Sequence, residues 1–140
     1  MLKIMIAVDG SEASLRATQS AIQSIAWYKQ APRIDLIAIH VSIPSVPHMG
    51  LVISQEMLDN YYREAMLARS SSVLDSLGVP YGTRWYIGPV AETIVEKAED
   101  MKIDLIYMGT RGMTAIPSLI LGSTTIKVLH LTHIPVVLIH

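Results

Sequence analysis

Short apolar runs of strand length alternate along this chain with longer segments of helical periodicity. The first run is continuously apolar, which is typical of a strand covered on both faces of a sheet, and the second, fourth and fifth are apolar at most positions. The runs span 4–8, 34–41, 83–87, 103–108 and 134–139, and the third is more polar, as suits an edge strand. The helical segments span 11–31, 54–78, 89–102 and 122–132. This order predicts an α/β fold with a parallel sheet and helices on both faces.

Cap and turn residues mark the ends of several helical segments. Ser11 suits the N-cap of the first, and Pro32 follows its predicted end. Gly78 suits the C-terminal stop of the second. Within that second segment, apolar pairs recur at helical spacing. They include Tyr61 and Tyr62, which we interpret as core contacts.

Length and composition limit the classes of protein to consider. We assign residues 1–140 to one domain with a full core. A formal net charge of −1 argues against a nucleic-acid partner, which needs a basic face. No apolar run approaches the ~18 residues of a membrane span, and Asp9 interrupts the first run too early for a signal peptide. Without cysteine there are no disulfides or thiolate metal sites, so we expect a cytoplasmic protein without membrane insertion.

Two glycine segments lie between the fourth apolar run and the last helical segment. They are Gly109-Thr110-Arg111-Gly112 and Gly122-Ser123-Thr124. A helix start offers unpaired N–H donors and a partial positive charge, and glycines let the backbone approach an anion closely. The guanidinium of Arg111 can clamp a phosphate. These features predict a phosphate site. The alternative is a structural connection in which Ser123 caps the helix.

Asp9 lies where a parallel sheet usually binds its ligand. Ligands bind beyond the carboxyl ends of the strands, at the point where the winding reverses. If the first and fourth strands are neighbours, Asp9 faces the glycine segment, where it can contact hydroxyls, amines or a bridging metal. The alternative is a cap or turn role, because Asp-Gly-Ser is a turn signal. The segment 42–53, which contains prolines and a glycine, is long enough to serve as a lid.

The sequence carries no motif of efficient catalysis. A Gly-x-Gly-x-x-Gly after the first run is missing, which disfavours a dinucleotide-binding Rossmann site, and the P-loop motif is missing too. None of the five histidines has the spacing of a helical metal site, although His130 and His133 share a predicted helix face. No general base is paired with a nucleophile. We therefore assign no catalytic residue and expect no efficient catalysis.

Taken together, these residues resemble the universal stress protein family from end to end. The matching pieces are 6–11, 40–41, 108–112, 121–124 and 134–139. The most specific is the spacing Gly-x2-Gly-x9-Gly-Ser/Thr of Gly109, Gly112, Gly122 and Ser123, characteristic of members that bind ATP. The resemblance implies a three-layer sandwich, whose five-stranded parallel sheet has the order 3-2-1-4-5. This is a Rossmann-like fold, similar to that of the adenine nucleotide alpha hydrolases.

The resemblance also implies a bound adenine nucleotide, as ATP, ADP or AMP, together with Mg²⁺ or Mn²⁺. By position, the adenosine end would be lined by Ala7, Asp9 and the backbone of Val41. Ribose and phosphates would be held by Gly109, Thr110, Arg111, Gly112, Met113, Thr114, Ala115, Gly122, Ser123, Thr124 and Thr125. The segment 113–117 is more apolar than the often basic loop of the family. That departure is compatible with modest phosphate affinity and with AMP or ADP as the bound form.

Three functions stay open at this level. The first is an ATP-binding stress-response or regulatory module, whose nucleotide alters the surface offered to an unidentified protein partner. The second is a slow ATPase or adenylate-transferring enzyme, and the third is a non-nucleotide interaction protein with a structural glycine loop. The intact glycine spacing favours the first. The run 135–139 would form an uncovered sheet edge, so we expect a homodimer through this strand, as in related family members, or a higher oligomer.

Overall fold

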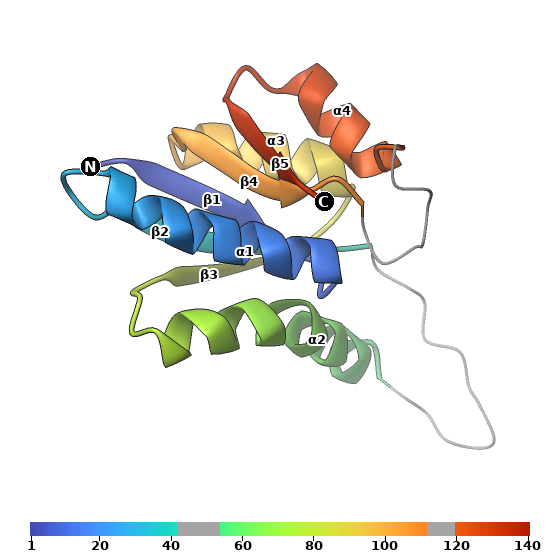
Figure 1. The fold of residues 1–140 in the computed structure, drawn as a ribbon. Coiled ribbons are helices and arrows are strands. Elements are labelled where there is room, and N and C mark those ends of the chain that lie inside the picture. The colour runs from blue at the N-terminus through green and yellow to red at the C-terminus, as the bar shows by residue number, and fades with distance from the viewer. Residues whose placement is uncertain (42–53, 112–119) are drawn as a thin grey trace.

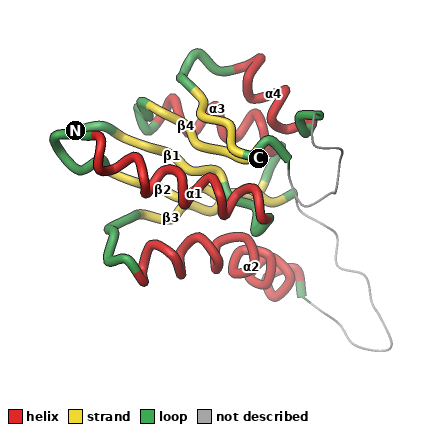
Figure 2. Tube along the Cα trace, viewed as in Figure 1, coloured by secondary structure: helices red, strands yellow, loops and turns green. Residues whose placement is uncertain are grey.

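The computed structural model describes residues 1–41, 54–111 and 120–140. Within them, five parallel strands form one sheet of order β3-β2-β1-β4-β5, which confirms the expected order. The strands are β1 (Lys3–Ala7), β2 (Arg33–His40), β3 (Gly82–Ile87), β4 (Leu105–Gly109) and β5 (Val136–Ile139). The helices are α1 (Glu12–Ser24), α2 (Gln55–Ser76), α3 (Val90–Asp100) and α4 (Ser123–Leu131), with a 3-10 turn η1 (Ile25–Trp27). Helices lie on both sides of the sheet, which gives three layers (Figures 1 and 2).

Each face of the sheet has its own apolar core. One core joins α1 and α2 to sheet residues such as Ile4, Ile6 and Leu36. The other core joins α3 and α4 to the strand residues on the opposite face of the sheet, among them Met5 and Ile37. Consecutive residues of β1 are therefore fully buried on opposite faces. This two-sided burial is the physical reason for the continuously apolar first run in the sequence.

All four helices end earlier than predicted, and α1 does so by the most residues. The predicted N-cap of α1 is confirmed, because Ser11 Oγ accepts a hydrogen bond from the N–H of Ser14 (3.1 Å). At the other end, the N–H of Ile25 donates to Ile22 O, which tightens the chain into η1. Helix α4 ends at Leu131, before Pro135, which disfavours helical backbone at the residue preceding it. His133 therefore lies beyond α4, and the predicted shared helix face with His130 is wrong.

The interpretation of both tyrosines of α2 as core contacts is wrong for Tyr61, which is 67% exposed. The buried residues of α2 are Leu67, Ser70 and Leu74, all in its C-terminal two thirds. A helix of 22 residues is about 33 Å long, whereas the eight-residue β2 spans about 26 Å. The first turns of α2 therefore extend past the sheet. No helix in the described part of the chain, α2 included, is long and apolar enough to cross a membrane.

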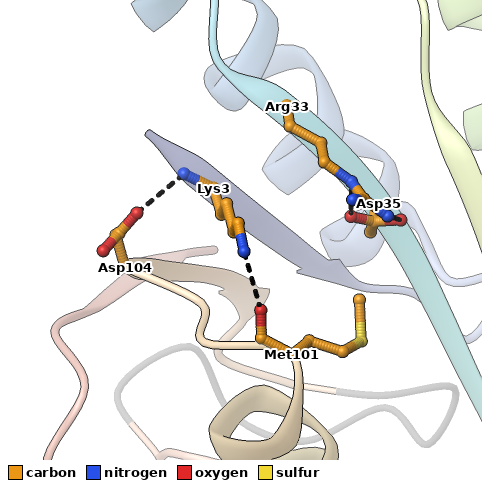
Figure 3. Close-up of polar contacts among 5 residues, drawn as sticks. All are labelled: Lys3, Arg33, Asp35, Met101 and Asp104. Carbon is orange, nitrogen blue, oxygen red and sulfur yellow. Dashed lines mark hydrogen bonds and ion pairs between the residues drawn. The ribbon is translucent and has the colours of Figure 1, made fainter. Parts of the chain in front are cut away.

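Polar contacts at the amino ends of the strands hold the connection before β4 against β1 (Figure 3). The N–H of Lys3 donates to Asp104 Oδ2 (2.8 Å), and the N–H of Asp104 donates to Lys3 O (2.9 Å). Lys3 Nζ also lies 3.4 Å from the carbonyl oxygen of Met101 at the end of α3. On β2, Arg33 pairs with the buried Asp35 (2.9 Å). These contacts occupy the end of the sheet opposite the candidate site.

Candidate functional site

A pocket of about 570 Å³ opens at the carboxyl ends of β1 and β4. These two strands are neighbours in the middle of the sheet, and the chain winds away from them in opposite directions. The position is the switch point at which open parallel sheets bind ligands. Residues from β1, β2 and β4 and from all four helices line the pocket.

Three hydrogen bonds tie the end of β4 to β5 and to the start of α4. The N–H of Thr110 donates to Ile139 O (2.9 Å), and Thr110 O accepts from the N–H of Gly122 (2.7 Å). The hydroxyl of Thr125 donates to Gly109 O (3.0 Å). The two glycine segments that are separated in the sequence are thereby held together at one side of the pocket.

The N-terminus of α4 faces this pocket without a side-chain cap. Its N-cap residue is Gly122, so the cap role predicted for Ser123 in the alternative of a structural connection is wrong. The first intrahelical bond runs from the N–H of Ile126 to Gly122 O (3.1 Å), so the N–H groups of 123–125 precede the helical ladder. Ser123 and Thr124 line the pocket with these groups. Thr125 lines the pocket too, but its hydroxyl donates its hydrogen bond to Gly109 O. The Thr125 hydroxyl therefore has no proton left to donate to a phosphate.

Asp9 has the predicted turn role and also lies at the pocket, where its contact with a ligand stays a prediction. Its Oδ1 accepts a hydrogen bond from the N–H of Ser11 (2.9 Å), which is a turn role, and the residue also lines the pocket. Gly10 follows with a φ of 82°, in the left-handed region. A Cβ at Gly10 would lie 2.8 Å from Ala65 O, so the turn packs directly against the backbone of α2.

The structure brings most of the predicted site residues together. Lining the pocket are Ala7, Asp9, Gly109, Arg111, Gly122, Ser123, Thr124 and Thr125. Thr110 is buried and Val41 is 60% exposed beyond β2, and neither is among the lining residues. Gly112, Met113, Thr114 and Ala115 lie outside the described residues, as does the predicted lid at 42–53.

One wall of the pocket is apolar and was not predicted as part of the site. It consists of Ile37, Ile39, Val90, Ile94 and Met108, which all belong to the core under α3 and α4, whereas the lining residue Met66 packs on the opposite core. In the sequence these residues belong to ordinary strand and helix patterns, so only the topology shows that they converge. Ser14, near the start of α1, is a further unpredicted lining residue. An apolar wall beside a polar helix start suits a flat organic group that carries an anion.

Charge is sparse around the pocket. Asp9 and Arg111 are the charged residues that line it. Nearby, Lys127 of α4 pairs with Glu92 of α3 (2.8 Å), and this hydrogen bond lowers the pKa of Glu92. The described residues contain no group of three or more His, Asp or Glu side chains that could hold a metal ion. For the Mg²⁺ or Mn²⁺ implied by the resemblance, the described lining offers one carboxylate, that of Asp9.

His40 stands out as a buried polar residue outside the pocket. Its ring stacks on Tyr62, with centroids 4.4 Å apart, and on Trp85 at 5.7 Å. The Nε2 atom is buried, and within the described chain it has no hydrogen-bond partner. Asp59 Oδ1 lies 3.9 Å from it, beyond hydrogen-bond distance. In the sequence His40 only closes the second apolar run, and nothing there signals the aromatic stack.

Comparisons with known proteins cover the whole chain. A model of the universal stress protein family matches residues 1–140. Universal stress protein MJ0531 of Methanocaldococcus jannaschii is 35% identical to this chain over 143 residues, covering 98% of this chain and 81% of the relative.

Two solved structures share the fold. A universal stress protein in complex with cAMP has a TM-score of 0.71 and 21% identity, over 99% of this chain and 97% of that one. A universal stress protein family protein from Arabidopsis thaliana with AMP bound has a TM-score of 0.68 and 18% identity, over 99% and 91% of the two chains. The family model and the M. jannaschii relative show the family, and the solved structures agree in fold. This chain belongs to the universal stress protein family.

Proposed function

We propose that this universal stress protein binds an adenine nucleotide and acts in the cytoplasm as a stress-response or regulatory module. Nucleotide occupancy would alter the surface that it offers to a protein partner. The observation that carries the proposal is the pocket, in which an apolar wall meets the N-terminus of α4. A base suits the wall and a phosphate suits the helix start. The solved relatives that hold cAMP and AMP support the same class of ligand.

Each part of the nucleotide has a matching part of the pocket in this proposal. Adenine would lie on the apolar wall, with Ala7 and the carboxylate of Asp9 toward the adenosine end. Phosphate would meet the N–H groups at the start of α4, the hydroxyls of Ser123 and Thr124, and the guanidinium of Arg111. A role for the backbone of Val41 and for 112–115 stays a prediction from the family resemblance.

The protein purified under native conditions is expected to retain an adenine nucleotide or to bind one when it is added. Native mass spectrometry of the purified protein measures this directly, because the mass difference identifies the ligand. Titration with AMP followed by calorimetry covers the case in which purification removes it. A protein that neither retains nor binds any adenine compound would contradict the proposed function and would favour a structural role for the glycine segments.

We also propose a homodimer through β5, which forms one edge of the sheet. The carbonyl groups of Pro135 and Ile139 accept hydrogen bonds from Ile106 and Thr110 on the β4 side. Because backbone groups alternate in direction along a strand, those of Val136 and Leu138 point away from β4. They form an open row that a second copy can satisfy by antiparallel pairing about a twofold axis.

Replacing Leu138 by Pro is expected to convert this dimer into a monomer, because it removes an outward N–H without touching the bonds to β4. Leu138→Ala is the matched control, since it loses the same packing but keeps the N–H. A charge at Val137 would be less informative, because that side chain packs against the core beneath α1. Multi-angle light scattering measures the mass. A monomeric parent protein at tens of micromolar, or a dimeric Leu138→Pro variant, would exclude this interface.

A further inference from the structure

The pocket provides little positive charge to balance a chain of phosphates. Among the described residues, its lining contains one cation, Arg111, and one acid, Asp9. The start of α4 adds roughly half a positive charge. The undescribed segments cannot add fixed charge, because 112–119 contains no charged residue or histidine and 42–53 contains only His48. Lys127, the next cation along the chain, is paired with Glu92 and does not line the pocket.

A phosphate monoester carries about −1.5 to −2 charges at pH 7, and each further phosphate adds at least one more. Arg111 and the start of α4 balance part of a single phosphate group. In ATP the second and third phosphates would meet hydroxyls and backbone, with no further cation, and the carboxylate of Asp9 would oppose them. Lengthening the phosphate chain therefore adds desolvation and repulsion without adding an ion pair.

A divalent metal does not remedy this imbalance through the side chains of this site. Asp9 is the carboxylate in the pocket lining, and its Oδ1 already accepts the N–H of Ser11. Neither undescribed segment contains an Asp or Glu. Mg²⁺ is usually bound through one or two carboxylates besides the phosphates, and here Asp9 would have to serve alone, through its second oxygen.

We propose that this pocket selects adenine nucleotides that carry a single phosphate, such as AMP or a cyclic monophosphate, and that it binds them without a metal ion. This inference rests on the proposed nucleotide-binding function and specifies its ligand. The selection comes from charge, so it predicts that adding one positive charge inside the pocket shifts the preference toward longer phosphate chains.

The test is a calorimetric titration of the nucleotide-free protein with adenosine, AMP, ADP and ATP, in EDTA and again with Mg²⁺. AMP is expected to bind about tenfold more tightly than adenosine and at least as tightly as ATP. Mg²⁺ is expected to leave AMP binding unchanged. Arg111→Gln is expected to bring AMP close to the affinity of adenosine.

Asp9→Asn tests the charge argument, because its amide oxygen can still accept the N–H of Ser11 while the negative charge is lost. It is expected to improve ATP relative to AMP by about tenfold. Glu12→Gln is the matched control. It makes the same change in net charge on the neighbouring turn of α1, where Glu12 pairs with Arg69 (2.6 Å) and does not line the pocket. We expect it to leave the ratio within about twofold.

The outcomes separate this inference from the proposed function. ATP binding ten times tighter than AMP in EDTA, binding that requires Mg²⁺, or equal affinity for adenosine and AMP would each overturn the selection while nucleotide binding stands. An unchanged ratio in a folded Asp9→Asn variant would overturn the charge argument. If no adenine compound binds, the proposed function fails and this inference fails with it.

Discussion

Replacing Gly122 by Asp is expected to weaken AMP binding at least about tenfold while leaving the protein as stable as before or slightly more stable. Gly122 is the N-cap of α4, and its φ of −65° and ψ of 155° are accessible to any residue. An aspartate there accepts hydrogen bonds from the first-turn N–H groups and suits the positive helix end. The same carboxylate occupies the donors that we assign to phosphate and repels the anion. Because stability and affinity change in opposite directions, unfolding cannot explain the loss.

Gly122→Asn is the matched control for this prediction. Asparagine caps the same N–H groups with a side chain of the same size but carries no charge, so a smaller loss of affinity is expected. Calorimetry with AMP measures affinity, and thermal unfolding without ligand measures stability. Unchanged affinity in a folded Gly122→Asp protein would remove the start of α4 from the phosphate site.

The architecture could be predicted from the sequence because its signals are local and repeated. The apolar positions of α3 recur at helical spacing, and Ala91, Ile94, Val95 and Ala98 are indeed buried. The continuous apolar run of β1 identified the two-sided burial of that strand, and the family resemblance supplied the order of the sheet, which is confirmed. The periodicity of α2 was misleading at Tyr61, because the pattern marks an apolar stripe but does not reveal where the helix extends past the sheet.

The candidate site could be predicted only in part. Glycines and hydroxyls near the end of a strand signal an anion site, and of the residues that carry this signal Gly109, Gly122, Ser123 and Thr124 line the pocket. The apolar wall carries no signal of its own, since Ile37 or Ile94 is equally compatible with plain core packing. The hydrogen bond from the Thr125 hydroxyl to Gly109 O joins residues that are 16 apart in the sequence, and it depends on how α4 packs against the end of β4. Such features follow from tertiary packing, which no local pattern encodes.

The role of Gly109 illustrates the same limit and leads to the second large expected effect. The sequence suggests that its missing side chain makes room for a phosphate. In the structure a Cβ at Gly109 would lie 2.7 Å from Ala13 Cβ and 3.1 Å from the Ala13 carbonyl carbon, so the space is taken by α1. Gly109→Ala is therefore expected to destabilise the fold by about 1–3 kcal/mol through overpacking. Gly88→Ala is the control and should cost less, because its Cβ would meet only Thr93 Oγ1, at 3.2 Å.

Removing the opposing methyl group should recover part of this loss. Ala13→Gly alone costs up to about 1 kcal/mol in helix propensity, but it clears the closest contact for a Cβ at position 109. The double variant Gly109→Ala with Ala13→Gly is expected to be more stable than the sum of the single losses by about 0.5 kcal/mol or more. The recovery is partial, because the backbone of Ala13 and Arg111 O at 3.2 Å stay close. Urea unfolding of the four proteins measures the coupling. Strictly additive losses would show that the contact with the Ala13 methyl group is not what requires a glycine at position 109.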